Sequence, residues 1–196
     1  MNITNGLAFA DDPVLGSPPQ LFFGTDNAPD GAAEPYLSAP LGSVYVQRDV
    51  DTAATLTGSL QKVKDDGAAN DWTGLQCISK TVALADFTDG GAAVGTYVLA
   101  QAIPVGALFL YSQVIGVTGF AGDTSAVLTI GDGTDVDRYN TGTPSVFATA
   151  NQMAMGAASG TVIHTAAATV TLTVTTAADW GSVSAGALTV RLWFLR

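Results

Sequence analysis

The chain is poor in charged residues, and above all in those that favour long helices. Charged side chains make up 12% of its 196 residues, with seven Lys and Arg against 17 Asp and Glu. Its only glutamate is Glu34. A typical globular domain has about 25% charged residues, and its helices draw on Glu, Lys and Arg. The composition therefore argues against long helices and favours short strands rich in Val, Thr and small residues.

Basic residues are also too few for a nucleic-acid-binding protein. The formal net charge is -10, whereas direct binding of DNA or RNA needs clustered Lys and Arg that replace phosphate counterions. The same acidity argues against binding to an anionic membrane surface. We expect no nucleic-acid and no membrane partner, although an acidic chain can dock on a basic patch of another protein.

The sequence also lacks a second cysteine, a long apolar run and the pattern of a secretion signal. Cys77 is the only cysteine, so no intrachain disulfide can form. No stretch reaches the roughly 18–20 apolar residues of a membrane span. The first ten residues lack the basic start and apolar run of a secretion signal. We expect packing or assembly, not cross-links, to stabilise the protein.

Residue patterns for catalysis or metal binding are weak. His164 is the only histidine, and Ser159 near it lacks the flanking sequence of a nucleophile elbow. We therefore expect a structural histidine, no enzyme activity and no cofactor. The densest acidic cluster, Asp132, Asp135 and Asp137, is a weak calcium candidate, because carboxylate oxygens are calcium ligands. Its spacing does not match an EF-hand loop, and Asp and Gly are also the ordinary residues of tight turns.

The clearest positive signal is alternation near the C-terminus. Apolar residues occupy every second position in 170–174 and again in 188–194, which is typical of strands with one face on a core. In the last strand the opposite face also carries the apolar Trp193 and Leu195. We interpret these two residues as a contact with another subunit, or else as a surface packed against the protein's own N-terminal arm or hairpin.

Three regions differ in composition, and together they predict an all-β protein. Residues 1–40 hold six of the eight prolines, which remove backbone donors and block helices, so an extended N-terminal arm is predicted. Residues 41–79 are predicted to form a small β-hairpin module. Residues 80–196 are predicted to form a jelly-roll-like antiparallel β-sandwich. Its expected strands are 81–84, 95–102, 108–117, 125–130, 138–139, 161–164, 168–175 and 188–195. A loop is expected over 143–160, in which only 148–154 could form a helical turn.

The predicted arm contains one apolar patch, Leu21, Phe22 and Phe23, which has the pattern of a short strand. Its aromatic content is high for a purely disordered tail. We expect these three residues to contact a neighbouring protein, with disorder of the arm as the alternative.

Two sets of segments resemble structural proteins of tailed bacteriophages. The first is APLGSVYV at 39–46, with LQKV at 60–63 and NDWT at 70–73. It resembles a hairpin module of phage fibre and head-surface proteins. The second is IPVGAL at 103–108, with 114–120, LTIGD at 128–132, DRY at 137–139 and SAGALTV at 184–190. It resembles the β-sandwich of small virion proteins of marine and environmental phages.

This resemblance implies a non-enzymatic particle component, usually a homotrimer, with no catalytic residues to carry over. The expected function is a capsid decoration (cement) or head-fibre protein on the outer surface of the virion. It would bind the major capsid protein through residues 1–40. The alternative is a tail-fibre or baseplate adhesin that binds host glycans through Trp72 or Trp180. A calcium-dependent, lectin-like sandwich is a third hypothesis.

Overall fold

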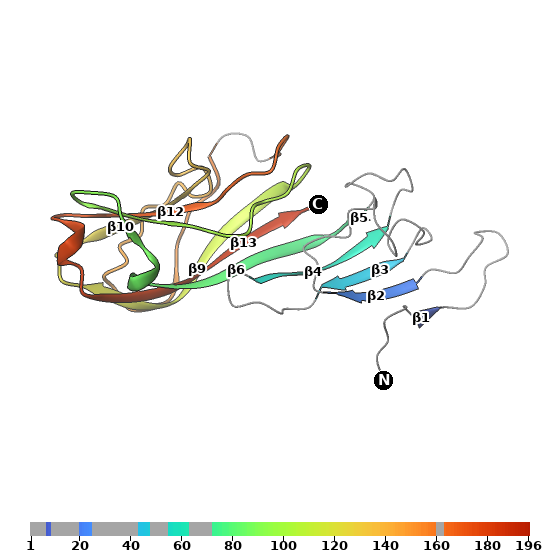
Figure 1. The fold of residues 1–196 in the computed structure, drawn as a ribbon, viewed down its shortest axis with the longest axis horizontal. Coiled ribbons are helices and arrows are strands. Elements are labelled where there is room, and N and C mark those ends of the chain that lie inside the picture. Colours follow the sequence, from blue (N-terminus) through green and yellow to red (C-terminus); the bar gives the residue numbers. More distant parts are fainter. Residues whose placement is uncertain (1–6, 9–19, 25–42, 48–54, 63–71, 160–162) are drawn as a thin grey trace. The chain divides into compact units, whose positions relative to one another are not determined.

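The computed structural model of the chain describes residues 7–8, 20–24, 43–47, 55–62, 72–159 and 163–196. These residues form β-strands and two short 3₁₀ turns, so the predicted all-β class is confirmed (Figure 1). The chain divides into two compact units. The first comprises residues 1–51, 56–77 and 195–196, and the second comprises residues 52–55 and 78–194.

The first unit contains a sheet in the order β1-β2-β3-β4, with β5 paired to β4. Strands β3 and β4 are antiparallel, as expected of a hairpin, whereas β2 and β3 are parallel. Strand β2 contains the Leu21 to Phe23 patch, and it pairs within its own chain. Apart from β1 and β2, the predicted arm lies outside the described residues, so an extended arm is not confirmed. The strands are β1 Leu7–Ala8, β2 Gln20–Gly24, β3 Val44–Gln47, β4 Thr55–Lys62 and β5 Trp72–Thr73.

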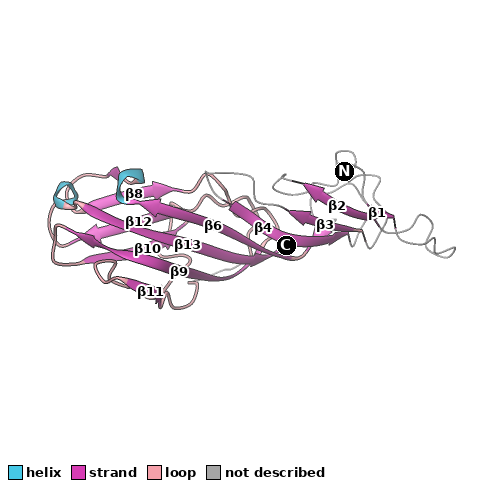
Figure 2. Cartoon of the chain, turned by 90° about the horizontal axis from the view of Figure 1, so that it is seen from below, coloured by secondary structure: helices cyan, strands magenta, loops and turns pink. Residues whose placement is uncertain are grey.

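The second unit is a β-sandwich of two four-stranded layers, which Figure 2 shows as magenta arrows. One layer has the order β6-β13-β9-β11 and the other β10-β12-β8-β7. In the first layer the strands are β6 Leu75–Ala83, β13 Ala185–Leu195, β9 Leu108–Ala121 and β11 Ala150–Met153. In the second they are β10 Ala126–Gly131, β12 Thr171–Thr176, β8 Val94–Val98 and β7 Thr88–Asp89. The 3₁₀ turns are η1, Leu84–Asp86, and η2, Trp180–Ser182.

The antiparallel sandwich is confirmed, but the jelly-roll connectivity is not. Successive strands of a jelly roll alternate between its two sheets, whereas β7 and β8 are consecutive and pair within one sheet. The predicted strand at 138–139 is wrong, because these residues form a turn. The predicted loop over 143–160 is also wrong in part, because it contains β11, which pairs with β9, and its 148–154 stretch forms no helical turn.

The core lies between the two layers, and its pattern explains the alternation in the sequence. Inward side chains of the last strand are fully buried, and so are those of β10 and β12. Burying one such side chain contributes about 1.5–3 kcal/mol, so this set accounts for much of the stability. The residues are Leu188, Val190, Leu192 and Phe194 on β13, Leu128 and Ile130 on β10, and Leu172 and Val174 on β12.

One end of the sandwich is filled by aromatic rings. Trp180 is only 5% exposed, and its ring centroid lies 5.5 Å from that of Phe87. The indole lies directly on Gly95 of β8, where an added Cβ would come within 2.3 Å of the ring. Gly95 is therefore needed for the close packing of Trp180.

One side of the sandwich is closed by the segment between β10 and β11. Val146 donates its N–H to Ala126 O of one sheet and accepts a hydrogen bond from Phe120 N of the other. Asn140 is fully buried, and its Oδ1 accepts a hydrogen bond from Ile130 N. The outer edge of β10 is thus paired by this segment, which also holds the polar loop described next.

Candidate binding surfaces

The acidic cluster after β10 forms a tight turn. The Asp132 carboxylate accepts hydrogen bonds from Thr134 N at 3.0 Å and from Asp135 N at 2.8 Å. Asp132 N donates to Asp135 O across the turn. At Gly131 an added Cβ would lie 2.2 Å from Asp135 O, so only glycine fits there. This geometry is that of a side-chain-stabilised turn, the ordinary alternative to a metal loop.

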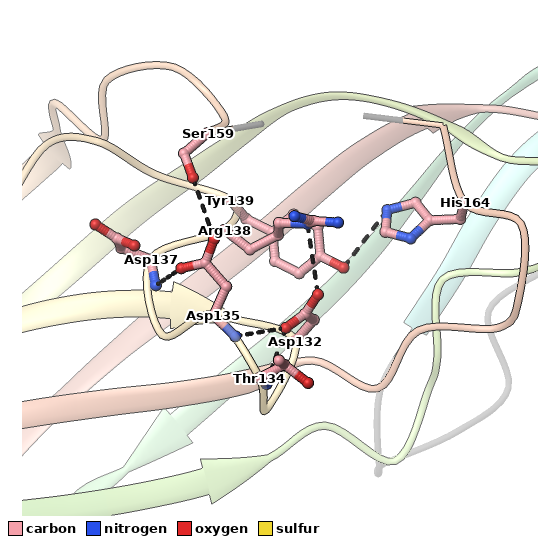
Figure 3. A network of polar contacts seen from close by, with 8 residues as sticks. All are labelled: Asp132, Thr134, Asp135, Asp137, Arg138, Tyr139, Ser159 and His164. Atoms are coloured by element: carbon pink, nitrogen blue, oxygen red, sulfur yellow. Dashed lines mark hydrogen bonds and ion pairs between the residues drawn. The ribbon is translucent and has the colours of Figure 1, made fainter. Parts of the chain in front are cut away.

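Two of the three carboxylates of this loop, those of Asp132 and Asp135, contact neighbouring protein groups (Figure 3). Asp132 Oδ2 lies 3.4 Å from Arg138 Nε, and Ser159 Oγ donates to Asp135 Oδ2 at 3.4 Å. In the described part of the chain, no three His, Cys, Asp or Glu side chains are grouped so that they could hold a metal ion. The calcium hypothesis for Asp132, Asp135 and Asp137 therefore gains no support from the structure.

Hydrogen bonds and charges within the loop lower the pKa of Asp132 and raise the pKa of Asp137. Burial alone would raise the pKa of Asp132, but the N–H groups of Asp135 and Thr134 and the Arg138 guanidinium lower it overall. A hydrogen bond with the Asp135 carboxyl raises the pKa of Asp137, and burial and the like charge act in the same direction. The loop therefore holds one stabilised carboxylate and one that is protonated more readily.

His164 is buried beside Tyr139. Its Nε2 lies 3.5 Å from the Tyr139 hydroxyl (Figure 3). Burial, followed by the charge of Arg138, lowers the pKa of His164, and burial also raises the pKa of Tyr139 well above its usual range. The Ser159 hydroxyl donates to Asp135 and not to His164, so the two residues do not form a nucleophile and base pair. This arrangement fits the structural histidine expected from the sequence.

Trp193 lies on the outer face of the β6-β13-β9-β11 sheet, as the alternation predicted. It stacks on Tyr111 of β9, with ring centroids 6.0 Å apart and planes inclined by 25°. Tyr111 is 46% exposed, and Leu110 next to it is also exposed. The Trp193 Nε1 atom is covered and has no hydrogen-bond acceptor among the described residues. The second apolar face of β13 is thus partly covered by another strand of the same chain.

Strand directions bring two polar side chains next to this aromatic pair. Ser184 N donates to Ala121 O at one end of the β9–β13 pair, and Tyr111 meets Trp193 at the other. The strands are therefore antiparallel, and Gln113 and Arg191 occupy the next row on the same face. Both are partly exposed. Strands β6, β9 and β13 contain no Asp or Glu. Arg191 is the one charged residue in the cross-strand row that it shares with Gln113.

The outer face of the second sheet has a different character. Thr173 of β12 pairs with Thr129 of β10 and Thr96 of β8 in one cross-strand row. Val98, at the end of this face, is 55% exposed. The nine outward positions of the three strands carry no charge. They are Val127, Thr129 and Gly131 on β10, Thr171, Thr173 and Thr175 on β12, and Val94, Thr96 and Val98 on β8.

The other residues expected to make contacts lie in the first unit. Leu195 is 42% exposed, and mutual hydrogen bonds between Gly74 and Arg196 place the exposed Leu75 beside it. Leu21, Phe22 and Phe23 belong to β2, but their side chains lie outside the described part of the chain, as does that of Trp72 in β5.

Trp180 is not available to a ligand. Its burial against Gly95 contradicts the hypothesis that it stacks on a glycan. The sequence did not identify Tyr111, because Leu110 and Tyr111 are consecutive exposed residues that interrupt the alternation of β9. The position of Tyr111 follows from its stacking on Trp193 of a strand distant in sequence, and not from a local motif.

Comparison with known proteins yields no match to a protein-family model, a curated protein or a solved structure. None of the helical segments within the described ranges is long and apolar enough to cross a membrane.

Proposed function

We propose that the chain is a non-catalytic structural protein of a bacteriophage virion, a capsid decoration or head-fibre protein that associates with copies of itself. The observation that supports self-association best is the uncharged Thr and Val face of the β10-β12-β8 sheet. The phage assignment rests on the sequence resemblance. A trimer is the expected assembly.

The uncharged face suits a contact between identical subunits. The chain has a net charge of -10, so most surfaces of two copies would repel each other. The strands of this face contribute no carboxylate, which lessens that repulsion although the acidic loop after β10 lies against Gly131 at one end. Burying Thr and Val costs far less desolvation than burying charges. In a cyclic trimer the contacts between neighbouring subunits are heterologous, and an uncharged face that lies toward the three-fold axis can form them without burying charged side chains.

The mass in solution tests self-association. A trimer has a mass of about 60 kDa, three times the 19.9 kDa of one chain. Val98→Asp combined with Thr173→Lys places charges in the uncharged face, and we expect it to reduce the mass toward that of a monomer. Thr118→Lys, at an exposed position of β9, is the matched control. A monomeric wild type, or a double variant with unchanged mass, would contradict this contact.

The particle itself tests the virion assignment. We propose that residues 1–40 bind the major capsid protein, with Leu21 and Phe23 among the contacts. Mass spectrometry of purified particles that carry the gene is expected to find the chain in many copies. Leu21→Asp combined with Phe23→Asp is expected to leave the chain soluble and absent from particles. Absence of the wild-type chain from intact particles would overturn the assignment.

A second candidate function, an adhesin for host glycans, is favoured by one observation. The Tyr111–Trp193 pair, with Tyr111 exposed and Trp193 partly exposed, provides an aromatic surface of the kind on which sugars stack.

A further inference from the structure

We propose that the outer face of β9 and β13 is a binding site for an acidic saccharide. A sugar ring would lie on the Tyr111–Trp193 pair, with its carboxylate against Arg191. This site differs from the uncharged face of the other sheet, and it does not depend on the virion assignment.

The apolar part of the site is the aromatic pair. The two rings are nearly parallel, and Tyr111 stays 46% exposed although it lies beside the apolar Leu110. Exposed aromatic groups gathered at one place mark a binding surface more often than scattered ones do. Tyr and Trp combine a flat apolar face with a polar edge, which matches a sugar ring with its C–H face and peripheral hydroxyls.

The polar part of the site is the next cross-strand row. Arg191 has no ion-pair partner within the described ranges, and the three strands β6, β13 and β9 contribute no carboxylate to it. A guanidinium binds a carboxylate through two parallel hydrogen bonds. In a chain with 17 acidic residues and seven basic ones, an unpaired arginine beside an aromatic pair favours an anionic ligand over a cationic one.

The aromatic pair together with Gln113 and Arg191 narrows the class of ligand further. Nucleic acid is disfavoured by the net charge of -10. A purely apolar partner would leave Arg191 and Gln113 desolvated without hydrogen bonds, which is costly. An acidic saccharide supplies an apolar ring face for Tyr111, hydroxyls for Gln113 and a carboxylate for Arg191. A few polar groups beside an aromatic surface are the usual composition of a small-molecule site.

A glycan array tests this inference on the full-length protein. The array carries uronic-acid and sialic-acid oligosaccharides beside their neutral counterparts. We expect the wild type to bind acidic members, Tyr111→Ala to lose binding at least tenfold, and Arg191→Gln to lose the preference for acidic over neutral members. Thr118→Ala, at an exposed position of β9, is expected to bind as the wild type does.

The controls separate binding from folding and from assembly. Thermal unfolding is expected to be nearly unchanged for Arg191→Gln, because the side chain of Arg191 is partly exposed on the outer face of the sheet. If the wild type binds no saccharide, the inference is wrong. If it binds none while Tyr111→Ala and Arg191→Gln lower the mass in solution, the surface is a contact between subunits. If both variants bind saccharide as the wild type does, a saccharide site elsewhere replaces this one.

Discussion

The two sheets of the sandwich share one core but present different outer faces. The β10-β12-β8 face is regular, with Thr, Val and Gly in straight cross-strand rows. The β9–β13 face is irregular, with two consecutive exposed residues at Leu110 and Tyr111 and a positive φ of 58° at Gly116. Regular pairing produces a flat, uniform surface. An irregularity in β9 instead places Tyr111 on the outer face, directly after the exposed Leu110. This difference suggests assembly on one face and ligand recognition on the other.

The largest expected effect is a loss of stability when the packing beneath the β10-β12-β8 sheet is disturbed. Gly95→Ala places a Cβ within 2.3 Å of the Trp180 ring, so the indole or β8 must shift. We expect a loss of about 3 kcal/mol in the free energy of unfolding, as for other overpacked core positions. Chemical denaturation measures it. Thr96→Val, on the outward side of the same strand, is the control and is expected to change stability by less than about 0.5 kcal/mol.

The second effect concerns the paired edge of the same sheet. Asn140→Ala removes the acceptor of Ile130 N and the amide donor to Leu128 O in a fully buried place. An unsatisfied buried group costs about 1–3 kcal/mol, and we expect a loss of about 2 kcal/mol. Amide exchange at Ile130 is expected to become faster in this variant. Unchanged exchange would contradict the role of Asn140 in closing the edge.

The third effect tests the irregularity of β9. Gly116 has space around it, because nothing lies within 4 Å of an added Cβ, but its φ of 58° disfavours any other residue. Gly116→Ala is therefore expected to cost about 1 kcal/mol through backbone strain alone. Chemical denaturation measures both glycine variants. An equal loss in the free energy of unfolding for Gly116→Ala and Gly95→Ala would contradict the distinction between backbone strain at Gly116 and steric overlap at Gly95.

The smallest effect is a pH dependence centred on His164. Because the pKa of this buried histidine is lowered in the fold, the unfolded chain binds the proton more readily. Stability is complete above the unfolded value of about 6.5 and falls as the pH drops below it. We expect a loss below about 1 kcal/mol between pH 7 and pH 5. In His164→Gln this decline is expected to disappear, and a wild-type curve that is flat over that range would refute the prediction.

The predictable part of the fold was the part with local periodicity. The inward residues of β12 and β13 alternate strictly, so the sequence alone placed these strands and their buried faces. Strand β11, ANQM, has no such pattern, and its pairing with β9 defines it. The turn at 138–139 looked like a strand, but Tyr139 N donates to Ile130 O and folds the chain back.

The candidate sites show the same limit. Trp193 was identified because it interrupts a regular strand with an apolar residue on the wrong side. Its neighbour Tyr111 was not, because register between strands far apart in sequence depends on the whole sheet. The acidic loop was noticed for its composition, yet its hydrogen bonds, which only the structure gives, show a turn.

The double use of Val146 has a consequence for how the protein avoids uncontrolled aggregation. Unpaired strand edges are templates for amyloid-like stacking. By bonding Ala126 in one sheet and Phe120 in the other, a single residue occupies polar backbone groups along one side of the sandwich. In a chain so rich in Val and Thr, this pairing protects one side of the sandwich from the addition of further strands.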